Sequence, residues 1–410
     1  MKIELAYGHG HFNFDLPAAE NNLTTFQPHR NSIDPVCLAL AAPLDSPRLC
    51  ELAHAGQKVV IVTSDITRPC PTHLLLPPLM DELASAGIRD EDVTVVFALG
   101  SHRKHTPEEQ RTLTGNAMTE RLHCIDSDPG QTIQIGCTTR GTPIEIFEPV
   151  VRADFRIVLG NVEPHYFAGY SGGAKALIPG VCSVNTIRAN HAFMVDPLAC
   201  SGNLDTNPVR QDIEEGAAML GIDFMLNVVL DSDKNIVVAA AGNPITAHRW
   251  LCKVVDAVSM NHVKKQADIV IVSAGGYPKD INMYQAQKAL DNAAAAAKPG
   301  GQIIWLAQCQ EGLGNKTFEE WMVGSSPEMI LARIQQDFVL GGHKAAAIAR
   351  VLKRANILLV SDLPDDLVRQ CSMEPYHDLD SALQAALGRC QPDPLISVIP
   401  EGGSVLLKVD

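Results

Sequence analysis

The chain has 410 residues, of which 46% are hydrophobic and 20% are charged, so it is long enough for two or three domains with substantial cores. Its 33 basic and 47 acidic side chains give a formal charge of −14, which argues against a nucleic-acid partner and against binding to an anionic membrane. The 11 cysteines include no C-x-x-C pair, and neither a cleavable signal nor an apolar run of membrane-spanning length is present, so we expect a soluble, cytoplasmic protein with reduced thiols.

Apolar runs rich in valine and isoleucine alternate with helical patterns along the chain. The run at residues 57–64 predicts a buried strand before a helix near residues 72–86, and a strand at 92–98 precedes a helix at 107–113 that Thr106 caps. Further strands are predicted at residues 156–160, 224–230, 267–273, 302–307, 356–360 and 404–409, and further helices at 281–298 and 343–354.

Strands that alternate with helices indicate an α/β fold with mainly parallel, helix-covered sheets. A polar helix end at residues 263–268 precedes a new series of strands and helices. We therefore expect two domains, over residues 1–265 and residues 266–410.

Polar residues and glycines follow four of the predicted strands. Ligands bind beyond the carboxyl ends of parallel strands, so these residues predict a site at one rim of the sheets. Any one of the four segments alone is better explained as a turn with helix capping, and the four together favour a site. The residues are Asp65, Thr67 and Arg68; Gly100, Ser101, His102, Arg103 and His105; Asn161, Glu163 and His165; and Gly275, Gly276, Tyr277, Lys279 and Asp280.

The stretch from residue 163 to residue 180, EPHYFAGYSGGAKALIPG, is the most informative part of the chain. Glycines let a backbone approach a ligand closely, and a lysine just beyond them meets an anion or serves as a covalent anchor. A surface glycine turn with a solvated lysine remains the alternative. The residues concerned are His165, Gly169, Gly172, Gly173 and Lys175, with His191 one predicted helix later.

Two standard nucleotide-binding motifs do not match this stretch. A P-loop needs Ser or Thr directly after its lysine, whereas Lys175 is followed by Ala176. No G-x-G-x-x-G follows a predicted strand, so the dinucleotide fingerprint is missing too.

Five segments in the same order, and a further one near residue 341, resemble the lactate racemase family, whose members carry a nickel-pincer nucleotide. The segments are SDITRP (64–69), GSHRKHT (100–106), PHYFAGYSGGAK (164–175), NH (190–191), GGYPKDINMYQAQKA (275–289) and GGHKA (341–345). Each segment alone is a weak signal, and their shared order makes the resemblance specific.

The resemblance implies a role for each matching residue. Residues 1–265 would form a catalytic domain that anchors the cofactor, residues 266–410 would complete the site, and the active site would lie between the two domains. Lys175 would attach the nickel-pincer nucleotide covalently, Gly169, Ser171, Gly172 and Gly173 would surround it, and His191 would bind nickel, which imidazole suits. The acid/base pair would be His102 and His165, the substrate carboxylate would meet Arg68 and Lys288, and their neighbours would be Asp65, Tyr284 and Gln285.

The chemistry of a 2-hydroxy acid explains why such parts are needed. Its α-hydrogen is scarcely acidic beside a carboxylate, so hydride removal to a planar keto acid is the better route to inversion, and a cofactor supplies the acceptor. Two histidines serve the hydroxyl positions of the two enantiomers, and an arginine and a lysine hold the carboxylate.

We therefore expect an isomerase, a racemase or epimerase of lactate or of a larger 2-hydroxy acid such as malate or a sugar acid. Alternatives are a non-catalytic cofactor- or ligand-binding homologue and a zinc hydrolase built from His102, His105, His165 and His191, although these histidines lack clustered metal-ligand spacing. His105 lies outside the family's catalytic positions, which favours a supporting role. The expected partners are a small-molecule substrate and cofactor maturation enzymes, without which the protein would lack its cofactor, and a homo-oligomer is left open.

Overall fold

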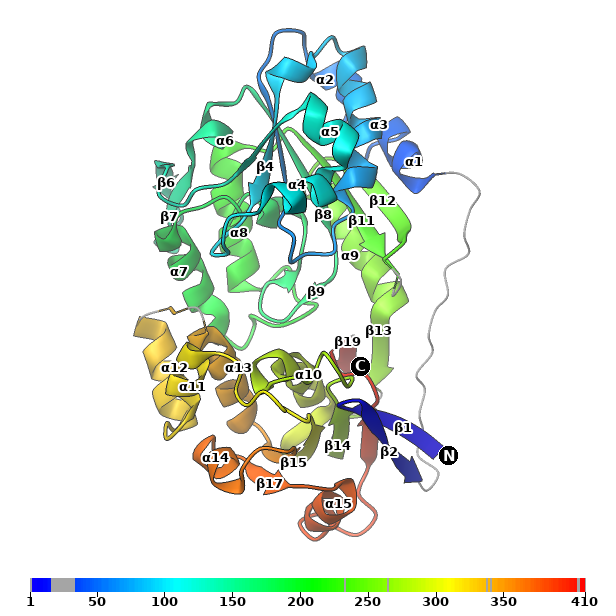
Figure 1. Cartoon of the computed structure of the whole chain (residues 1–410), viewed down its shortest axis with the longest axis vertical. Helices are drawn as coiled ribbons and strands as arrows, with labels where there is room; N and C mark the ends of the chain where they lie inside the picture. The colour runs from blue at the N-terminus through cyan, green and yellow to red at the C-terminus, as the bar shows by residue number, and fades with distance from the viewer. Residues whose placement is uncertain are drawn as a thin grey trace. The chain divides into compact units, whose positions relative to one another are not determined.

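The structure is a computed structural model that describes residues 2–15, 34–231, 234–263, 265–336, 338–339, 341–403 and 406–409. The described residues form two compact units, which are described separately (Figure 1). Residues 34–258 are termed the first unit. The second unit consists of the two N-terminal strands and the described chain from Ser259 onward.

The first unit is built on a six-stranded sheet with the strand order β12-β11-β8-β3-β4-β5. Neighbouring strands pair in parallel except for β11 and β12, which pair antiparallel. The four strands predicted for this part of the chain are confirmed, whereas β5 and β12 were not predicted. The bounds are β3 (Val59–Ser64), β4 (Val93–Ala98), β5 (His123–Asp126), β8 (Phe155–Asn161), β11 (Phe224–Leu230) and β12 (Ile236–Gly242).

Both faces of this sheet are buried. One face packs Ile61, Phe97 and Ile157 against five helices, and the other carries the fully buried Val62 and Val158. Thr106 caps α4 as predicted, through a reciprocal pair of hydrogen bonds with Glu109 at 2.8 and 3.2 Å. The five helices are α1 (Pro35–Ala41), α2 (Leu49–Leu52), α3 (Thr72–Ser85), α4 (Pro107–Thr114) and α5 (Asn116–Arg121).

The remaining elements of the first unit are an antiparallel hairpin and several short strands and helices. The hairpin is β6 (Thr132–Cys137) with β7 (Pro143–Phe147). The others are η1 (Asp90–Asp92), α6 (Glu148–Arg152), β9 (Pro164–His165), β10 (Gly169–Tyr170), η2 (Gly173–Ala176), α7 (Val184–Ala192), η3 (Phe193–Val195), α8 (Pro208–Leu220) and α9 (Thr246–Ser259). The short helix η2 packs on β3 and β8, and α8 packs on η2.

The second unit contains a five-stranded, fully parallel sheet with the order β17-β16-β15-β14-β18. The predicted strands at 267–273, 302–307 and 356–360 are confirmed, and β15 begins five residues earlier than predicted. The bounds are β14 (Ala267–Ser273), β15 (Ala297–Leu306), β16 (Asn356–Val360), β17 (Glu374–Tyr376), β18 (Ile396–Ile399), α10 (Met283–Ala296), α11 (Lys316–Met322), α12 (Pro327–Gln336), α13 (Gly342–Leu352), α14 (Asp365–Gln370) and α15 (Leu379–Leu387).

The N-terminal hairpin belongs to the second unit, in contrast to the expected N-terminal domain of residues 1–265. Its strands β1 (Lys2–Tyr7) and β2 (Gly10–Asp15) pair antiparallel, and Ile3 and Leu5 enter the same core as Ile271 and Leu306. The backbone N–H of Gly8 donates to the Asp280 carboxylate at 2.7 Å. The other end of the chain contributes β19 (Leu406–Val409), which lies within the predicted terminal strand and pairs in parallel with β13 (Met260–Val263).

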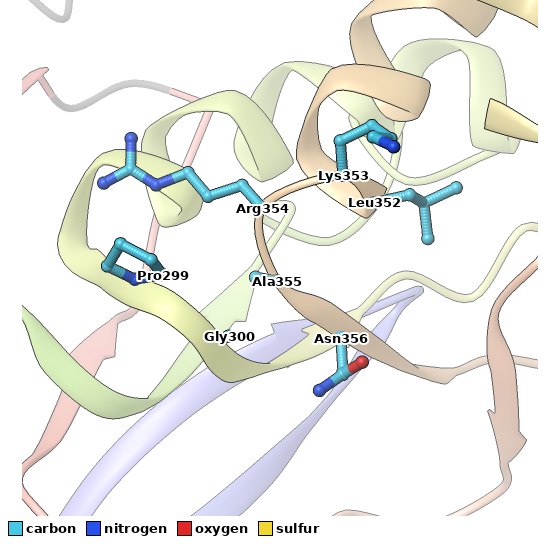
Figure 2. A pocket seen from close by; sticks show the side chains of 7 residues that line it. All are labelled: Pro299, Gly300, Leu352, Lys353, Arg354, Ala355 and Asn356. Atoms are coloured by element: carbon cyan, nitrogen blue, oxygen red, sulfur yellow. The ribbon is translucent and has the colours of Figure 1, made fainter. Parts of the chain in front are cut away.

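A shallow hollow of about 390 Å³ lies at the amino-terminal edge of the second sheet (Figure 2). Gly300 near the start of β15 and Asn356 at the start of β16 contribute to it, and the N–H of Gly300 donates to the Arg354 carbonyl at 2.7 Å. Ligands of parallel sheets bind at the opposite, carboxyl edge, and the hollow contains none of the predicted site residues. Within the described ranges, no helix combines the length and apolar character that crossing a membrane requires.

Candidate active site

Three predicted polar loops meet at one edge of the first sheet. Strands β8, β3 and β4 are neighbours and run in parallel, so the loops after Asn161, Ser64 and Ala98 leave from the same edge. The strand order reverses between β3 and β8, which is the position where open α/β sheets bind ligands. The fourth predicted loop follows β14 and belongs to the second sheet.

Asp65 and His102 form a hydrogen-bonded pair at this edge. Asp65 is 2% exposed, its Oδ2 contacts Nδ1 of His102, and its Oδ1 accepts from the N–H and hydroxyl of Thr67 at 3.2 and 2.7 Å. Burial raises the pKa of Asp65, but the hydrogen bonds from His102 and Thr67 outweigh burial and lower that pKa below its ordinary value. An ionised carboxylate only accepts, so Nδ1 of His102 carries a hydrogen, and in the tautomer with a single ring hydrogen the lone pair lies at Nε2.

His105 is engaged at both ring nitrogens. Its Nδ1 donates to Asp126 at 2.6 Å, and its Nε2 accepts from the backbone N–H of Ile66 at 3.0 Å. The side chain is 1% exposed and packs edge-on against Phe97. His105 therefore holds the loop that carries Asp65, which agrees with the supporting role expected for it.

His165 is half-buried in β9 and surrounded by cationic groups. Burial, together with the positive charges of Lys175, Arg68, His191 and Arg210, lowers the pKa of His165 well below its ordinary value, so the ring is neutral. Its Nδ1 accepts from the N–H of Ala168 at 3.3 Å, which places the ring hydrogen on Nε2. His165 thus presents a proton where His102 presents a lone pair.

Lys175 lies in η2 and is half-buried. Burial, followed by the charges of Arg68 and Arg210, lowers the pKa of Lys175 to about 7, against a smaller opposing effect of Glu163. Across the described residues, neither Lys175 nor the exposed Arg68 forms a side-chain hydrogen bond or ion pair. Both cations are therefore available to a ligand.

The glycine loop before Lys175 is fixed by close backbone packing. Gly172 has φ 73°, and a Cβ there would lie 2.6 Å from Oδ1 of Asn227 and 2.9 Å from Val162. The N–H of Gly173 donates to the same Asn227 oxygen at 2.7 Å, and a Cβ on Gly173 would lie 2.8 Å from the ring of His248. Only glycine fits these two positions.

Ser171 ties the start of this loop to the end of β8. Its hydroxyl donates to the Asn161 carbonyl at 2.8 Å and accepts from the N–H of Glu163 at 2.9 Å. The Ser171 carbonyl lies 2.7 Å from Nε2 of His248. At Gly169, a Cβ would lie 2.2 Å from the carbonyl oxygen of Asn203. The family segment thus owes much of its geometry to internal packing.

His191 lies near the end of α7, and Phe167 lies between it and His165. The Phe167 ring centroid is 4.9 Å from that of His191 and 4.6 Å from that of His165. Nδ1 of His191 lies 3.1 Å from Oδ1 of the fully buried Asn190. The predicted metal-binding histidine and the predicted acid/base histidine therefore share Phe167 as a packing partner.

The second unit places its three predicted site residues on the first turns of α10. Asn282 caps this helix by accepting from the N–H of Gln285 at 3.0 Å. Lys288 and Gln285 are exposed, whereas Tyr284 is partly buried and packs against Phe318. Residues spaced by three and four positions share one helix face, so Lys288 lies on the same side as Tyr284 and Gln285.

The sequence motifs missed several residues that support these sites. Asn227 and His248 hold the glycine loop, Arg210 donates to the Ala168 carbonyl at 3.2 Å, and Lys344 donates to the Tyr284 carbonyl at 2.7 Å. Lys344 lies in the GGHKA segment, for which the family resemblance implied no residue role. Its Nζ is 3.9 Å from the Tyr284 ring centroid. Asn227, His248 and Arg210 stand in no recognisable motif.

The described residues contain no group of three or more His, Cys, Asp or Glu side chains arranged to hold a metal ion. His105 has both ring nitrogens in use, which removes it from the four histidines of the zinc alternative. His191 and Lys175 both lower the pKa of His165, so both side chains lie near that ring. An imidazole is a donor type that suits a metal ligand, and an amine is one that suits a covalent anchor.

Solved structures with the same fold support the architecture. The lactate racemase apoprotein from Thermoanaerobacterium thermosaccharolyticum matches with a TM-score of 0.88 and 35% identity over 100% of both chains. A crystal structure of a protein from Thermotoga maritima matches with a TM-score of 0.63 and 19% identity over 88% of this chain and 96% of that one, which shows the fold alone. The expected α/β fold with parallel sheets is confirmed.

Sequence comparisons define the class as an isomerase. The chain is 35% identical to the lactate racemase of T. thermosaccharolyticum over 99% of both proteins, and 34% identical to that of Lactiplantibacillus plantarum over 90% of this chain and 89% of that protein. Residues 7–202 match the lactate racemase N-terminal domain and residues 262–407 match the C-terminal domain. The chain belongs to the lactate racemase family, as the sequence segments indicated.

The packing of the glycine loop predicts a selective loss of stability. Gly172→Ala combines a strained φ with a steric clash, whereas Gly221→Ala has φ 86° and nothing within 4 Å of the new Cβ. Gly221→Ala, the control, should lower the free energy of unfolding by about 1 kcal/mol. Gly172→Ala should lower it by roughly 1–3 kcal/mol more than the control. Urea denaturation of both variants measures the difference, and equal losses would contradict the tight packing.

Proposed function

We propose that this protein racemises or epimerises a 2-hydroxy carboxylic acid, either lactate or a larger acid such as malate or a sugar acid. In this proposal it uses a nickel-pincer nucleotide attached to Lys175, with His191 as a nickel ligand. The named relatives are lactate racemases. The maturation enzymes that build the cofactor are proposed partners, and a cytoplasmic location is proposed with them.

The observation that carries the proposal is the concentration of cationic groups around His165. Burial, and then the charges of Lys175, Arg68, His191 and Arg210, lower the pKa of His165, in a chain with a net charge of −14. Cations packed this closely repel each other and gain free energy when an anion joins them. A 2-hydroxy acid brings a carboxylate, and a nucleotide brings a phosphate.

Lys175 has the properties required of a covalent anchor. An amine attacks a carbonyl or thiocarbonyl carbon only after it has lost its proton, and a pKa of about 7 makes a large neutral fraction available near neutral pH. The loop that ends at Lys175 is fixed by Asn227 and His248, so the amine is held in place before it reacts.

His102 and His165 are the proposed acid/base pair. His102 takes the substrate hydroxyl proton at Nε2, because Asp65 occupies its Nδ1. Neutral His165 donates a hydrogen bond from Nε2 to the substrate oxygen, and it takes the hydroxyl proton of the other enantiomer at Nδ1 after its long contact with the Ala168 N–H is given up. We assign Asp65 the task of orienting His102, which refines its expected place among the substrate-binding residues.

The cofactor supplies the hydride acceptor when it is bound, which this chemistry needs because the α-hydrogen is a poor acid. Arg68 is the proposed partner of the substrate carboxylate in the first unit, where its exposed guanidinium offers a bidentate donor. Lys288, Tyr284 and Gln285 are the proposed substrate residues of the second unit. The glycine loop with Gly169, Ser171, Gly172 and Gly173 surrounds the anchored group.

Two alternatives are weaker. A non-catalytic binding protein needs no pair of histidines in complementary hydrogen-bonding states, and the relatives are enzymes. A zinc hydrolase would need more protein ligands than His191 and its neighbours offer once His105 is committed to Asp126 and Ile66.

Maturation with the cofactor-building enzymes tests the proposal. The matured protein should contain nickel, show an added covalent mass, and invert at least one member of a panel of enantiopure 2-hydroxy acids. Lys175→Ala should lose the added mass and the activity, whereas the exposed-lysine control Lys253→Ala should keep both. Intact-mass spectrometry decides the anchor, and an unchanged added mass in Lys175→Ala would sink the assignment.

The lowered pKa of Lys175 predicts an unusual reactivity in the protein without cofactor. Only the neutral amine is acylated, so the rate at Lys175 should reach half of its maximum at about pH 7. An ordinary lysine reaches this point at about pH 10. Peptide mass mapping after brief acetylation measures the rate at each site, with Lys253 as an internal comparison. A profile that rises only near pH 10 would argue against the buried neutral amine.

The histidine pair predicts matched losses in both directions. His102→Ala and His165→Ala should each lower kcat/KM by at least about 10²-fold, the usual effect of losing a general acid or base. Enantiomers have an equilibrium constant of one, so both directions must fall by the same factor. The control His123→Ala alters an exposed histidine on β5. Near-normal activity in either site variant would rule out the two-histidine scheme.

Hydride transfer predicts that the α-hydrogen stays with the substrate. Racemisation of unlabelled substrate in heavy water should leave the α-carbon without deuterium at early conversion. A proton taken by histidine would instead exchange with solvent. NMR of the product measures the label, and substantial incorporation would overturn the hydride route whatever the metal.

A further inference from the structure

A buried hydrogen-bond network lies behind His191, and its members are Asp212, Asn190, Thr138 and Thr142. Asp212 on α8 and Asn190 on α7 are both 0% exposed. Oδ1 of Asp212 accepts from the Thr138 hydroxyl at 2.6 Å, and its Oδ2 accepts from the Thr142 hydroxyl at 2.9 Å and from Nδ2 of Asn190 at 2.8 Å. Three donors therefore surround this carboxylate.

The network determines which way the Asn190 amide faces. Its NH₂ group donates to Oδ2 of Asp212 and to the Val209 carbonyl at 3.2 Å, and both of these atoms only accept. Turning the amide over would set its oxygen against a carboxylate and a carbonyl. The amide oxygen therefore faces His191, and a buried amide cannot exchange these partners for water.

The orientation of Asn190 in turn determines the tautomer of His191. Oδ1 of Asn190 lies 3.1 Å from Nδ1 of His191 and can only accept, so Nδ1 carries the hydrogen. In the neutral ring the lone pair then stands at Nε2. Metal-binding histidines are commonly fixed by a partner at the other ring nitrogen in this way.

We propose that Asp212, acting through Asn190, sets the tautomer of His191 and so selects Nε2 as the nitrogen presented to nickel. The metal part of this inference rests on the proposed function. The tautomer part concerns this chain alone. Asp212 is a positioning residue, and the network explains why a carboxylate with no role in the reaction is buried between α8 and the β6–β7 hairpin.

The first experiment is NMR of the cofactor-free full chain labelled with ¹⁵N-histidine. Long-range ¹H–¹⁵N spectra distinguish a protonated ring nitrogen from one with a lone pair, and His191→Gln assigns the signals. The unaltered protein should show the lone pair at Nε2. Asp212→Asn gives Asn190 a partner that both donates and accepts, which permits the amide to turn, and should shift the lone pair partly or wholly to Nδ1.

Glu215→Gln is the matched control, because it makes the same chemical change on α8 at a residue that binds Thr139 and not Asn190. It should leave the His191 signals unchanged. Asn190→Ala removes the amide oxygen that faces Nδ1 of His191 and should give a mixture of tautomers. This variant replaces Asp212→Asn in the test if Asp212→Asn fails to fold. A lone pair at Nδ1 in the unaltered protein, or unchanged His191 signals in the foldable variant, would overturn the proposal.

The second experiment measures nickel loss from matured protein to a chelator. Asp212→Asn should release nickel about 10- to 100-fold faster, the usual effect of altering a residue that supports a metal ligand, and Glu215→Gln should match the unaltered protein. Equal release from both variants would overturn the metal part of the proposal. Absence of nickel from the matured unaltered protein would instead refute the proposed function and leave the NMR result standing.

Discussion

Desolvation of positive charge is the constraint on which the first unit depends. Arg210 is fully buried, and burial lowers its pKa to about 10 although it donates to the Ala168 carbonyl. The same environment lowers the pKa of Lys175 to about 7 and that of His165 well below its ordinary value. His165 is therefore neutral and Lys175 is only partly protonated near neutral pH, which reduces the cost of burying charge in this cluster.

The three histidines predicted for the site in the first unit are each held through Nδ1, and the three partners differ. His102 faces the Asp65 carboxylate, His165 accepts from a backbone N–H, and His191 faces an amide oxygen. A carboxylate partner favours the protonated form of a histidine ring, whereas a backbone N–H that donates to the ring disfavours that form. A neutral amide oxygen selects one tautomer and brings no net charge to the ring. One residue type is thereby placed in three different hydrogen-bonding states by its immediate partner.

The parts of this structure that could be predicted from sequence are those with local causes. The β3, β4, β8 and β14 strands follow from apolar runs, and the cap of α4 follows from Thr106 and Glu109. The family segments identified the family because their order along the chain is specific. The loop between β3 and α3 could be assigned to the site from sequence. The hydrogen bond between Asp65 and His102 could not be predicted, because it forms only when β3 and β4 pair and bring their ends together.

The features that could not be predicted from the sequence depend on contacts between residues far apart in the chain. Asn227 meets the glycine loop from 54 residues away, and His248 does so from 77 residues away. Neither residue stands in a motif, since an asparagine or a histidine in a strand or helix has many ordinary roles. The N-terminal strand was likewise expected with the chain that follows it, whereas its core partners Ile271 and Leu306 come more than 250 positions later.

The placement of β1 in the second unit has a consequence for synthesis on the ribosome. The first unit is one continuous stretch, so the loop that carries Lys175 acquires its partners as soon as α9 has emerged. The second unit is discontinuous, and β1 must wait for β14 to be translated before its apolar residues Ile3 and Leu5 find their core. Chains fold in units as they emerge, and contacts between distant segments form late. The proposed anchoring lysine is therefore in its folded environment before α10, with Lys288, has been made.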